Sequence, residues 1–197
     1  KVKKELPGEV SLYKSIDGIL SHKEIELVVV ATPDTNHYVP THKSLKAGKY
    51  VFVEKPVATT LEDLYAFASL ADTYPGKLIF GENQSFTYPV QAALQHCKHL
   101  GRFMTGTTFY VMPEANRIMG EGKWRTEQSY NPCAGGLSHN FMGALLFSES
   151  PIVRVSAMGS ILTYHENLDS YGGYDTMEGI LEFANGRHLT WQVCLAI

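Results

Sequence analysis

The chain has 197 residues, 44% of them hydrophobic, and a formal net charge of −3. This length is enough for one large domain or two small ones with a buried core. The negative charge argues against a nucleic-acid partner, because such proteins usually carry a basic face. No apolar run approaches the roughly 20 residues that a membrane-spanning helix needs, so we expect no membrane span.

Three widely spaced cysteines, Cys97, Cys133 and Cys194, indicate a reducing compartment. An odd and sparse set is typical of free thiols rather than of a disulfide framework. We therefore expect a cytoplasmic protein whose cysteines are buried and unreactive. The cysteines and histidines lack the spacing of a metal site, and His96 and His99, which share a helix face, have no further ligands nearby. The sequence predicts no metal.

The first part of the chain alternates short apolar runs with helical patterns. Strands are predicted at Leu27 to Ala31, Lys49 to Val53 and Lys77 to Phe80, the first of them buried on both faces. Helices are predicted at Ser11 to Ser21, at His37 to Ala47, and after a capping box, Thr59-Thr60-Leu61-Glu62. This order predicts right-handed crossovers within a parallel sheet.

The pattern changes near Phe86, so the sequence divides into an α/β part and an α+β part. One more helix is predicted at Pro89 to Leu100, and strands at Phe103 to Val111, Ile152 to Thr163, Met177 to Phe183 and His188 to Leu195. Asn185-Gly186 predicts a two-residue hairpin, which makes the second sheet at least partly antiparallel. Met112 to Leu137 shows little helical or strand periodicity, and a connection of this length more often has a function than not.

Polar residues follow each of the three strands predicted in the first part, at Thr32-Pro33, Glu54-Lys55-Pro56 and Glu82-Asn83. The carboxyl ends of parallel strands line a ligand crevice, so these residues are expected to converge on one site. Pro56 biases Lys55 toward an extended backbone. A lysine held at a crevice floor and partly removed from water can exchange a proton near neutral pH. The alternative is a surface lysine paired with Glu54.

Two segments carry a family resemblance: VVVATPDTNH at residues 28–37 and AGKYVFVEKP at residues 47–56. With the spacing between them, they closely resemble the glucose-fructose oxidoreductase, inositol dehydrogenase and MocA family. Gly81-Glu82-Asn83 with Pro89, and Trp124-Arg125 followed by Gly135-Gly136, resemble later parts of the same pattern. The resemblance covers essentially the whole chain.

The resemblance implies a Rossmann-type parallel sheet followed by an α+β domain with an open, mostly antiparallel sheet. Residues 1–86 would be the C-terminal part of a dinucleotide-binding Rossmann domain. Residues 87–197 would be the start of the substrate and oligomerisation domain, so a homo-oligomer is expected. The family's Gly-x-Gly-x-x-Gly turn is not found in this sequence. We therefore expect a fragment, incomplete as an enzyme, that further residues complete.

The resemblance also implies hydride transfer between NAD or NADP and a small-molecule substrate, a sugar- or polyol-like alcohol or ketone. Lys55 would assist proton transfer beside the nicotinamide. The residues that would lie along the cofactor are Thr32, Pro33, Asn36, His37 and Glu54. Those nearer the nicotinamide or a cofactor phosphate would be Asn83, Trp124 and Arg125. The sequence does not choose between NAD and NADP.

The position of the family's catalytic histidine depends on the alignment. Counting forward from Gly136 places Asn140 and Ala144 at the family's Asp and His positions, and both catalytic groups would then be lost. Counting back from the following strand places His139 there, near the start of a helix. We favour His139, because imidazole is the natural acid or base near neutral pH.

Two alternatives to an oxidoreductase remain. One is a non-catalytic cofactor- or sugar-binding or regulatory module, and the other is a chain whose second sheet serves self-association.

Overall fold

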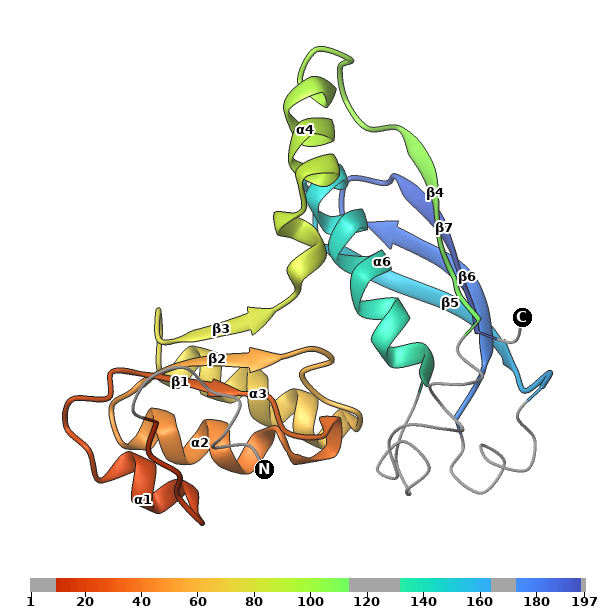
Figure 1. Ribbon diagram of the computed structural model, residues 1–197. Helices are drawn as coiled ribbons and strands as arrows, with labels where there is room; N and C mark the ends of the chain where they lie inside the picture. Colours follow the sequence, from red (N-terminus) through yellow and green to blue (C-terminus); the bar gives the residue numbers. More distant parts are fainter. Residues whose placement is uncertain (1–9, 114–131, 164–172, 196–197) are drawn as a thin grey trace.

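The computed structural model describes residues 10–113, 132–163 and 173–195, which form two sheets joined by helices (Figure 1). The first sheet is parallel, with the strand order β1-β2-β3. Its strands are β1 (Leu27–Val30), β2 (Tyr50–Glu54) and β3 (Leu78–Gly81). The helices α2 (Tyr38–Lys46) and α3 (Leu61–Thr73) cover one face of it. The core between sheet and helices consists of Val28, Val30, Leu45, Val51, Val53, Phe67 and Leu70.

The opposite face of this sheet is apolar and exposed. Its residues Leu27, Val29, Tyr50 and Ile79 have relative exposures between 51% and 60%. Because β1 alternates exposed and buried side chains, the prediction that this strand is buried on both faces is wrong. The continuous apolar run reflects a strand that could pack on two sides, of which the described residues cover only one.

The second sheet has four strands in the order β4-β7-β6-β5. Its strands are β4 (Thr105–Val111), β5 (Ile152–Ser160), β6 (Thr176–Phe183) and β7 (His188–Cys194). Only β4 and β7 pair in parallel, and the other two pairs are antiparallel. The helix α6 (Pro132–Ser148) lies across one face, with α4 (Tyr88–Cys97) beside it (Figure 1). The predicted fold class, a Rossmann-type parallel sheet followed by a mostly antiparallel one, is confirmed.

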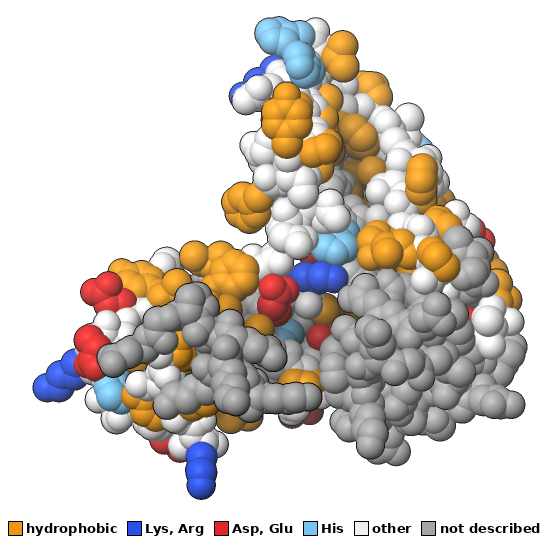
Figure 2. Space-filling model, viewed as in Figure 1, with side chains coloured by type: hydrophobic (Ala, Val, Ile, Leu, Met, Phe, Trp, Pro, Cys, Tyr) orange, Lys and Arg blue, Asp and Glu red, His pale blue; other side chains and the backbone are white. Residues whose placement is uncertain are grey.

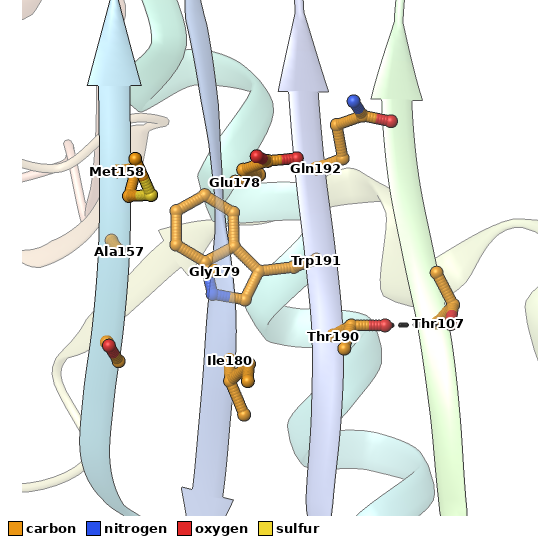
Figure 3. A pocket seen from close by; sticks show the side chains of 10 residues that line it. Thr107, Ala157, Met158, Glu178, Gly179, Ile180, Thr190, Trp191 and Gln192 are labelled. Atoms are coloured by element: carbon orange, nitrogen blue, oxygen red, sulfur yellow. Dashed lines mark hydrogen bonds between the residues drawn. The ribbon is translucent and has the colours of Figure 1, made fainter.

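The other face of the second sheet is open and carries a shallow groove of about 430 Å³ (Figure 3). Side chains from all four strands line it, among them Thr107, Met158, Glu178, Ile180 and Gln192. Across the β4–β7 pair, the hydroxyls of Thr107 and Thr190 share a hydrogen bond of 2.8 Å. This face therefore combines polar and apolar groups.

Several element boundaries differ from the sequence prediction. The first helix, α1, covers only Ile16–Leu20. The helix α3 is capped by Thr60, whose hydroxyl accepts the backbone N–H of Asp63 at 3.1 Å, so the cap lies one residue later than predicted. Residues 132–137, predicted to be part of an irregular connection, form the first turns of α6.

The β6–β7 hairpin also differs from the predicted two-residue turn. Phe183 N–H donates to the Arg187 carbonyl, and Gly186 N–H donates to the Phe183 carbonyl, both at 2.9 Å. The loop therefore has three residues, Ala184 to Gly186. Gly186 has φ of 80°, whereas Asn185 does not have positive φ, so the type I′ turn that an Asn-Gly pair favours does not form.

None of the helices in the described ranges is long and apolar enough to cross a membrane.

Candidate functional site

The carboxyl ends of the first three strands meet at one edge, as predicted. The parallel register aligns Val30 with Val53, and Glu54 with Gly81. The residues that follow each strand therefore emerge side by side, facing the second sheet and its helix α6. Figure 2 shows basic, acidic and histidine side chains gathering in the hollow between the two sheets. The described residues whose contacts bridge this hollow are Lys55, Glu82, Gly135 and His139.

Lys55 extends from the end of β2 toward the first turns of α6. Its Nζ lies 3.5 Å from the Gly135 carbonyl oxygen, which is the outer limit of a hydrogen bond. The side chain of Glu54 turns back instead, and its Oε2 accepts the backbone N–H of Lys55 at 3.1 Å. Within the described parts of the chain, Lys55 has no carboxylate partner. The alternative of a surface lysine paired with Glu54 is therefore not what the structure shows.

His139 reaches the same hollow from α6. It lies four residues, or about one helical turn, after Gly135, and so faces the same side of the helix. Its Nδ1 contacts Oε1 of Glu82, the residue that follows β3. Both side chains are nearly buried, at 10% exposure for His139 and 7% for Glu82. The end of one sheet and the helix of the other thus meet in a carboxylate–imidazole pair.

Tyr110, on β4, packs against the imidazole of His139. The ring centroids are 5.7 Å apart and the planes are inclined by 32°. Gly136 makes room for this tyrosine, since a Cβ at that position would lie 2.7 Å from Tyr110 Cδ1. The imidazole is therefore held by Glu82 at one nitrogen and by an aromatic ring against its face.

The environment of Glu82 favours its ionised form. Burial is the largest single influence and would raise the pKa, but the imidazole of His139 and the nearby hydroxyl of Ser138 outweigh it, so the pKa of Glu82 is lowered. Its Oε2 is buried and has no hydrogen-bond partner among the described residues. The site therefore contains a buried carboxylate beside an imidazole and a lysine.

His37 is buried, whereas a direct cofactor contact requires an exposed side chain. Its side chain is 1% exposed. Nδ1 lies 3.0 Å from the Pro56 carbonyl oxygen, and Nε2 lies 3.0 Å from the Thr32 carbonyl oxygen. Both ring nitrogens thus face backbone carbonyls at the ends of β1 and β2.

The other residues predicted to lie along the cofactor are at the surface of this edge. Thr32, Asn36 and Asn83 are exposed, and Pro33 and Glu54 are half-buried. The Thr32 hydroxyl donates to the Asn36 carbonyl at 3.0 Å, which closes the turn η2 (Asp34–Asn36). Asn83 opens η3 (Asn83–Phe86) directly after Glu82. Trp124 and Arg125 lie outside the described residues.

The two candidate alignments around α6 place different side chains toward the hollow. Asn140 is 4% exposed, accepts the Thr108 hydroxyl at 3.2 Å and donates to the Gln192 carbonyl at 3.0 Å. Ala144 is buried in the core of the second sheet. These two residues are one turn apart and share the face that packs on the sheet, whereas His139 faces Glu82.

Sequence reasoning placed Glu82 among the converging strand ends but assigned it no role, and it did not select Tyr110. Glu82 was visible as a polar residue after a strand, but its burial and its partner depend on α6, 57 residues later in the chain. Tyr110 could not be recognised as a site residue from the sequence. The alternation of exposed and half-buried residues in β4 indicates only that Tyr110 lies on the half-buried face of the strand.

Curated relatives match most of this chain. A 1-carboxy-3-chloro-3,4-dihydroxycyclohexa-1,5-diene dehydrogenase of Comamonas testosteroni is 27% identical in an alignment of 187 residues that covers 89% of this chain and 44% of that protein. An inositol 2-dehydrogenase of Rhizobium meliloti is 28% identical in an alignment of 189 residues that covers 88% of this chain and 52% of that protein. The chain therefore spans about half the length of these relatives.

Solved structures share the fold. The apo scyllo-inositol dehydrogenase of Lactobacillus casei superposes with a TM-score of 0.77 at 21% identity, over 97% of this chain and 55% of that one. The myo-inositol 2-dehydrogenase of Lactobacillus plantarum gives a TM-score of 0.77 at 17% identity, over 93% and 56%. The profile of the GFO_IDH_MocA family, described as an oxidoreductase family with an NAD-binding Rossmann fold, matches residues 5–82. Residues 5–82 thus carry the pattern of the GFO_IDH_MocA oxidoreductase family, for which NAD or NADP is the consistent cofactor.

Proposed function

We propose that this chain is part of an NAD(P)-dependent dehydrogenase or reductase that acts on a sugar- or polyol-like alcohol or ketone. The observation that carries the proposal is the meeting of Lys55 and the Glu82–His139 pair at the first turns of α6. An amine and an imidazole in one half-buried hollow can exchange a hydroxyl proton. The names of the inositol and dihydroxycyclohexadiene dehydrogenases support a ring-shaped alcohol as substrate.

The residues present fit the nicotinamide end of the cofactor. Lys55 brings an amine to the carboxyl edge of the parallel sheet, where dinucleotides bind in this fold class. Exposed Thr32, Asn36 and Asn83 would line its path, with Pro33 and Glu54 beside them. Bound there, the nicotinamide ring supplies the hydride acceptor or donor. Trp124 and Arg125 remain predicted contacts nearer the nicotinamide or a phosphate.

We assign His37 a supporting part in this cofactor site rather than a direct contact. A side chain that is 1% exposed presents almost no surface to a ligand. Its hydrogen-bonding groups face the carbonyls of Thr32 and Pro56, which border the predicted cofactor path. The imidazole would thus keep the two strand ends at a fixed separation while the cofactor occupies the edge.

In the oxidation direction, the O–H proton of the substrate would pass to His139 or Lys55 while the C–H bond breaks and its electron pair leaves with the hydrogen as hydride. In the reduction direction, the same group would return the proton to the alkoxide. The hollow is bordered by both sheets, so a substrate bound there would contact α6 on one side and the strand ends of the first sheet on the other.

We further propose that residues 1–86 and 87–197 act as the dinucleotide-binding part and the substrate part, and that the protein is a homo-oligomer. The open face of the second sheet supports the oligomer: its groove is lined by Met158 and Ile180 together with polar Thr107, Glu178 and Gln192. Mixed faces of this kind suit an interface with an apolar centre and hydrogen-bonding groups.

The test is turnover in the intact protein that contains this chain, with myo-inositol and either NAD⁺ or NADP⁺, followed by the absorbance of the reduced nicotinamide. Replacing Lys55 with Met keeps the length of the side chain and removes the amine. We expect kcat to fall by about 10²-fold, the lower range for loss of an acid–base group. The exposed Lys98 at the end of α4 provides the control, and Lys98→Met should leave kcat unchanged.

Cofactor binding without turnover on myo-inositol or a panel of related polyols and sugars would favour the alternative, a binding or regulatory module. Full activity in Lys55→Met would contradict the assigned role of Lys55. If titration leaves the fluorescence of NADH and NADPH unchanged, both the enzyme and the cofactor-binding module are excluded.

A further inference from the structure

Glu82 and His139 come from different sheets and lie 57 residues apart in the chain, yet they form a nearly buried pair. Glu82 lies between β3 and η3, directly after the last residue of the parallel sheet. His139 lies in α6, which packs on the second sheet through Ala144 and its neighbours. The contact therefore joins the end of a strand to a helix of the other sheet.

The charge of Glu82 needs a partner at this depth. A buried carboxylate is costly unless it is paired and hydrogen-bonded. Among the described residues, Oε2 of Glu82 has no hydrogen-bond partner, so the contact of Oε1 with His139 is its main compensation. The lowered pKa of Glu82 is consistent with an ionised carboxylate facing the imidazole.

An ionised carboxylate can only accept hydrogen bonds. The hydrogen on His139 must then lie on Nδ1, the nitrogen that contacts Glu82. In the neutral ring this leaves the lone pair on Nε2, the nitrogen on the other side of the imidazole. Tyr110 packs beside the ring, with the two centroids 5.7 Å apart.

We propose that Glu82 is a positioning residue, which holds His139 in the Nδ1–H tautomer and so presents Nε2 to the hydroxyl of the substrate. This inference rests on the proposed function, and it adds a residue that neither the sequence pattern nor the relatives' names assign. Glu82 acts through His139 and does not itself touch the reacting atoms.

The direct test is the ¹⁵N spectrum of the histidine side chains in the intact protein, with His139 assigned by its loss in His139→Gln. In its neutral form, His139 of the unaltered protein should carry its hydrogen on Nδ1. In Glu82→Gln the new amide can donate to Nδ1, so the hydrogen should move wholly or partly to Nε2. Glu62→Gln, at an exposed position of α3, is the matched control and should leave His139 unchanged.

Two outcomes of the spectrum would overturn the proposal. One is hydrogen on Nε2 of His139 in the unaltered protein, which requires no variant to fold. The other is a His139 signal that is the same in folded Glu82→Gln as in the unaltered protein. Because the spectrum is recorded without substrate, it is informative even if the proposed reaction is wrong.

Turnover gives the second readout. We expect Glu82→Gln to lower kcat by about 10- to 100-fold, as loss of an orienting partner does elsewhere, with KM nearly unchanged. Glu82→Asp keeps the charge and should recover part of the loss, whereas equal losses in the Asp and Gln variants would contradict a role for the charge. On a His139→Gln background, Glu82→Gln should add no further loss, and an additive loss would place Glu82 outside the His139 pathway. If the unaltered protein shows the expected tautomer but no turnover, the proposed function is refuted instead.

Discussion

The imidazole Nδ1 of His37 lies 3.0 Å from the carbonyl oxygen of Pro56, so that a residue at the start of α2 is tied to the turn that carries Lys55. The second ring nitrogen faces the Thr32 carbonyl at the same distance. One buried ring therefore bridges the ends of β1 and β2. In the neutral imidazole one nitrogen donates, and in the charged form both do.

The first prediction concerns this bridge. Replacing His37 with Ala leaves a cavity and removes the imidazole that contacts two carbonyls, so we expect the free energy of unfolding to fall by about 2–4 kcal/mol. Urea denaturation of the intact protein measures it. The exposed His99 is the control, and His99→Ala should change stability by less than about 0.5 kcal/mol. Equal effects of the two substitutions would show that the bridge contributes nothing.

Two glycines in α6 make a matched pair for the second prediction. A Cβ on Gly136 would lie 2.7 Å from Tyr110 Cδ1 and 3.2 Å from Val193 Cγ1, whereas a Cβ on Gly143 would meet nothing within 4 Å. Gly136→Ala should therefore lower stability by about 1–3 kcal/mol through overpacking. Gly143→Ala should raise it by up to about 1 kcal/mol, because alanine favours the helix. Thermal melting of both variants checks the sign, and a stabilised Gly136→Ala would refute the close packing of Tyr110.

The third prediction is a pH dependence set by Glu82. Its pKa is lower in the folded protein than in the unfolded chain, so its contribution is present above the usual glutamate pKa and is lost as the pH falls through the folded value. The groups facing it are His139, Ser138 and the backbone of Gln84. The stability difference between the unaltered protein and Glu82→Gln should thus be largest near neutral pH and narrow below about pH 4.3. Denaturation midpoints at several pH values test this, and a constant difference would contradict it.

The fourth prediction concerns Cys133, which is buried in α6. Burial is the main cause that raises the pKa of this thiol to about 12, and the charges of Asp175 and Cys194 add to its effect. At pH values near 8 the thiolate is almost absent, so Cys133 should react with a thiol reagent far more slowly than the half-buried Cys97 and Cys194. Unfolding should make all three react alike. Rapid modification of Cys133 in the folded protein, located by mass spectrometry, would be the contrary result.

The positions of the strands along the chain could be predicted from the sequence, because apolar runs and turn residues are local signals. Leu27 to Ala31 and Lys49 to Val53 were placed to within one residue of β1 and β2. The cap at Thr60 was missed by one position, because Thr59 and Thr60 offer the same hydroxyl and only the backbone decides which one accepts. The helix predicted from Ser11 formed only from Ile16, where it has few contacts with the core.

The site could be predicted only in part. Lys55 lies at the predicted crevice because a strand end and a proline are both visible in the sequence. His139 and Glu82 meet through the packing of α6 beside the first sheet, and no local pattern encodes that contact. His37 was predicted beside the cofactor because of its place in the motif, but its burial follows from how α2 packs beneath the strand ends.

The position of β7 in the second sheet has a consequence for the order in which the protein folds. β4 has β7 as its sole neighbour in the described sheet, although 76 residues separate Val111 from His188. Contacts between such distant segments form late and slowly. Tyr110 on β4 and Val193 on β7 both lie against Gly136 of α6. During synthesis, these contacts with Gly136, which lies three residues before His139 in α6, are therefore completed only after the ribosome has released residues 188–194.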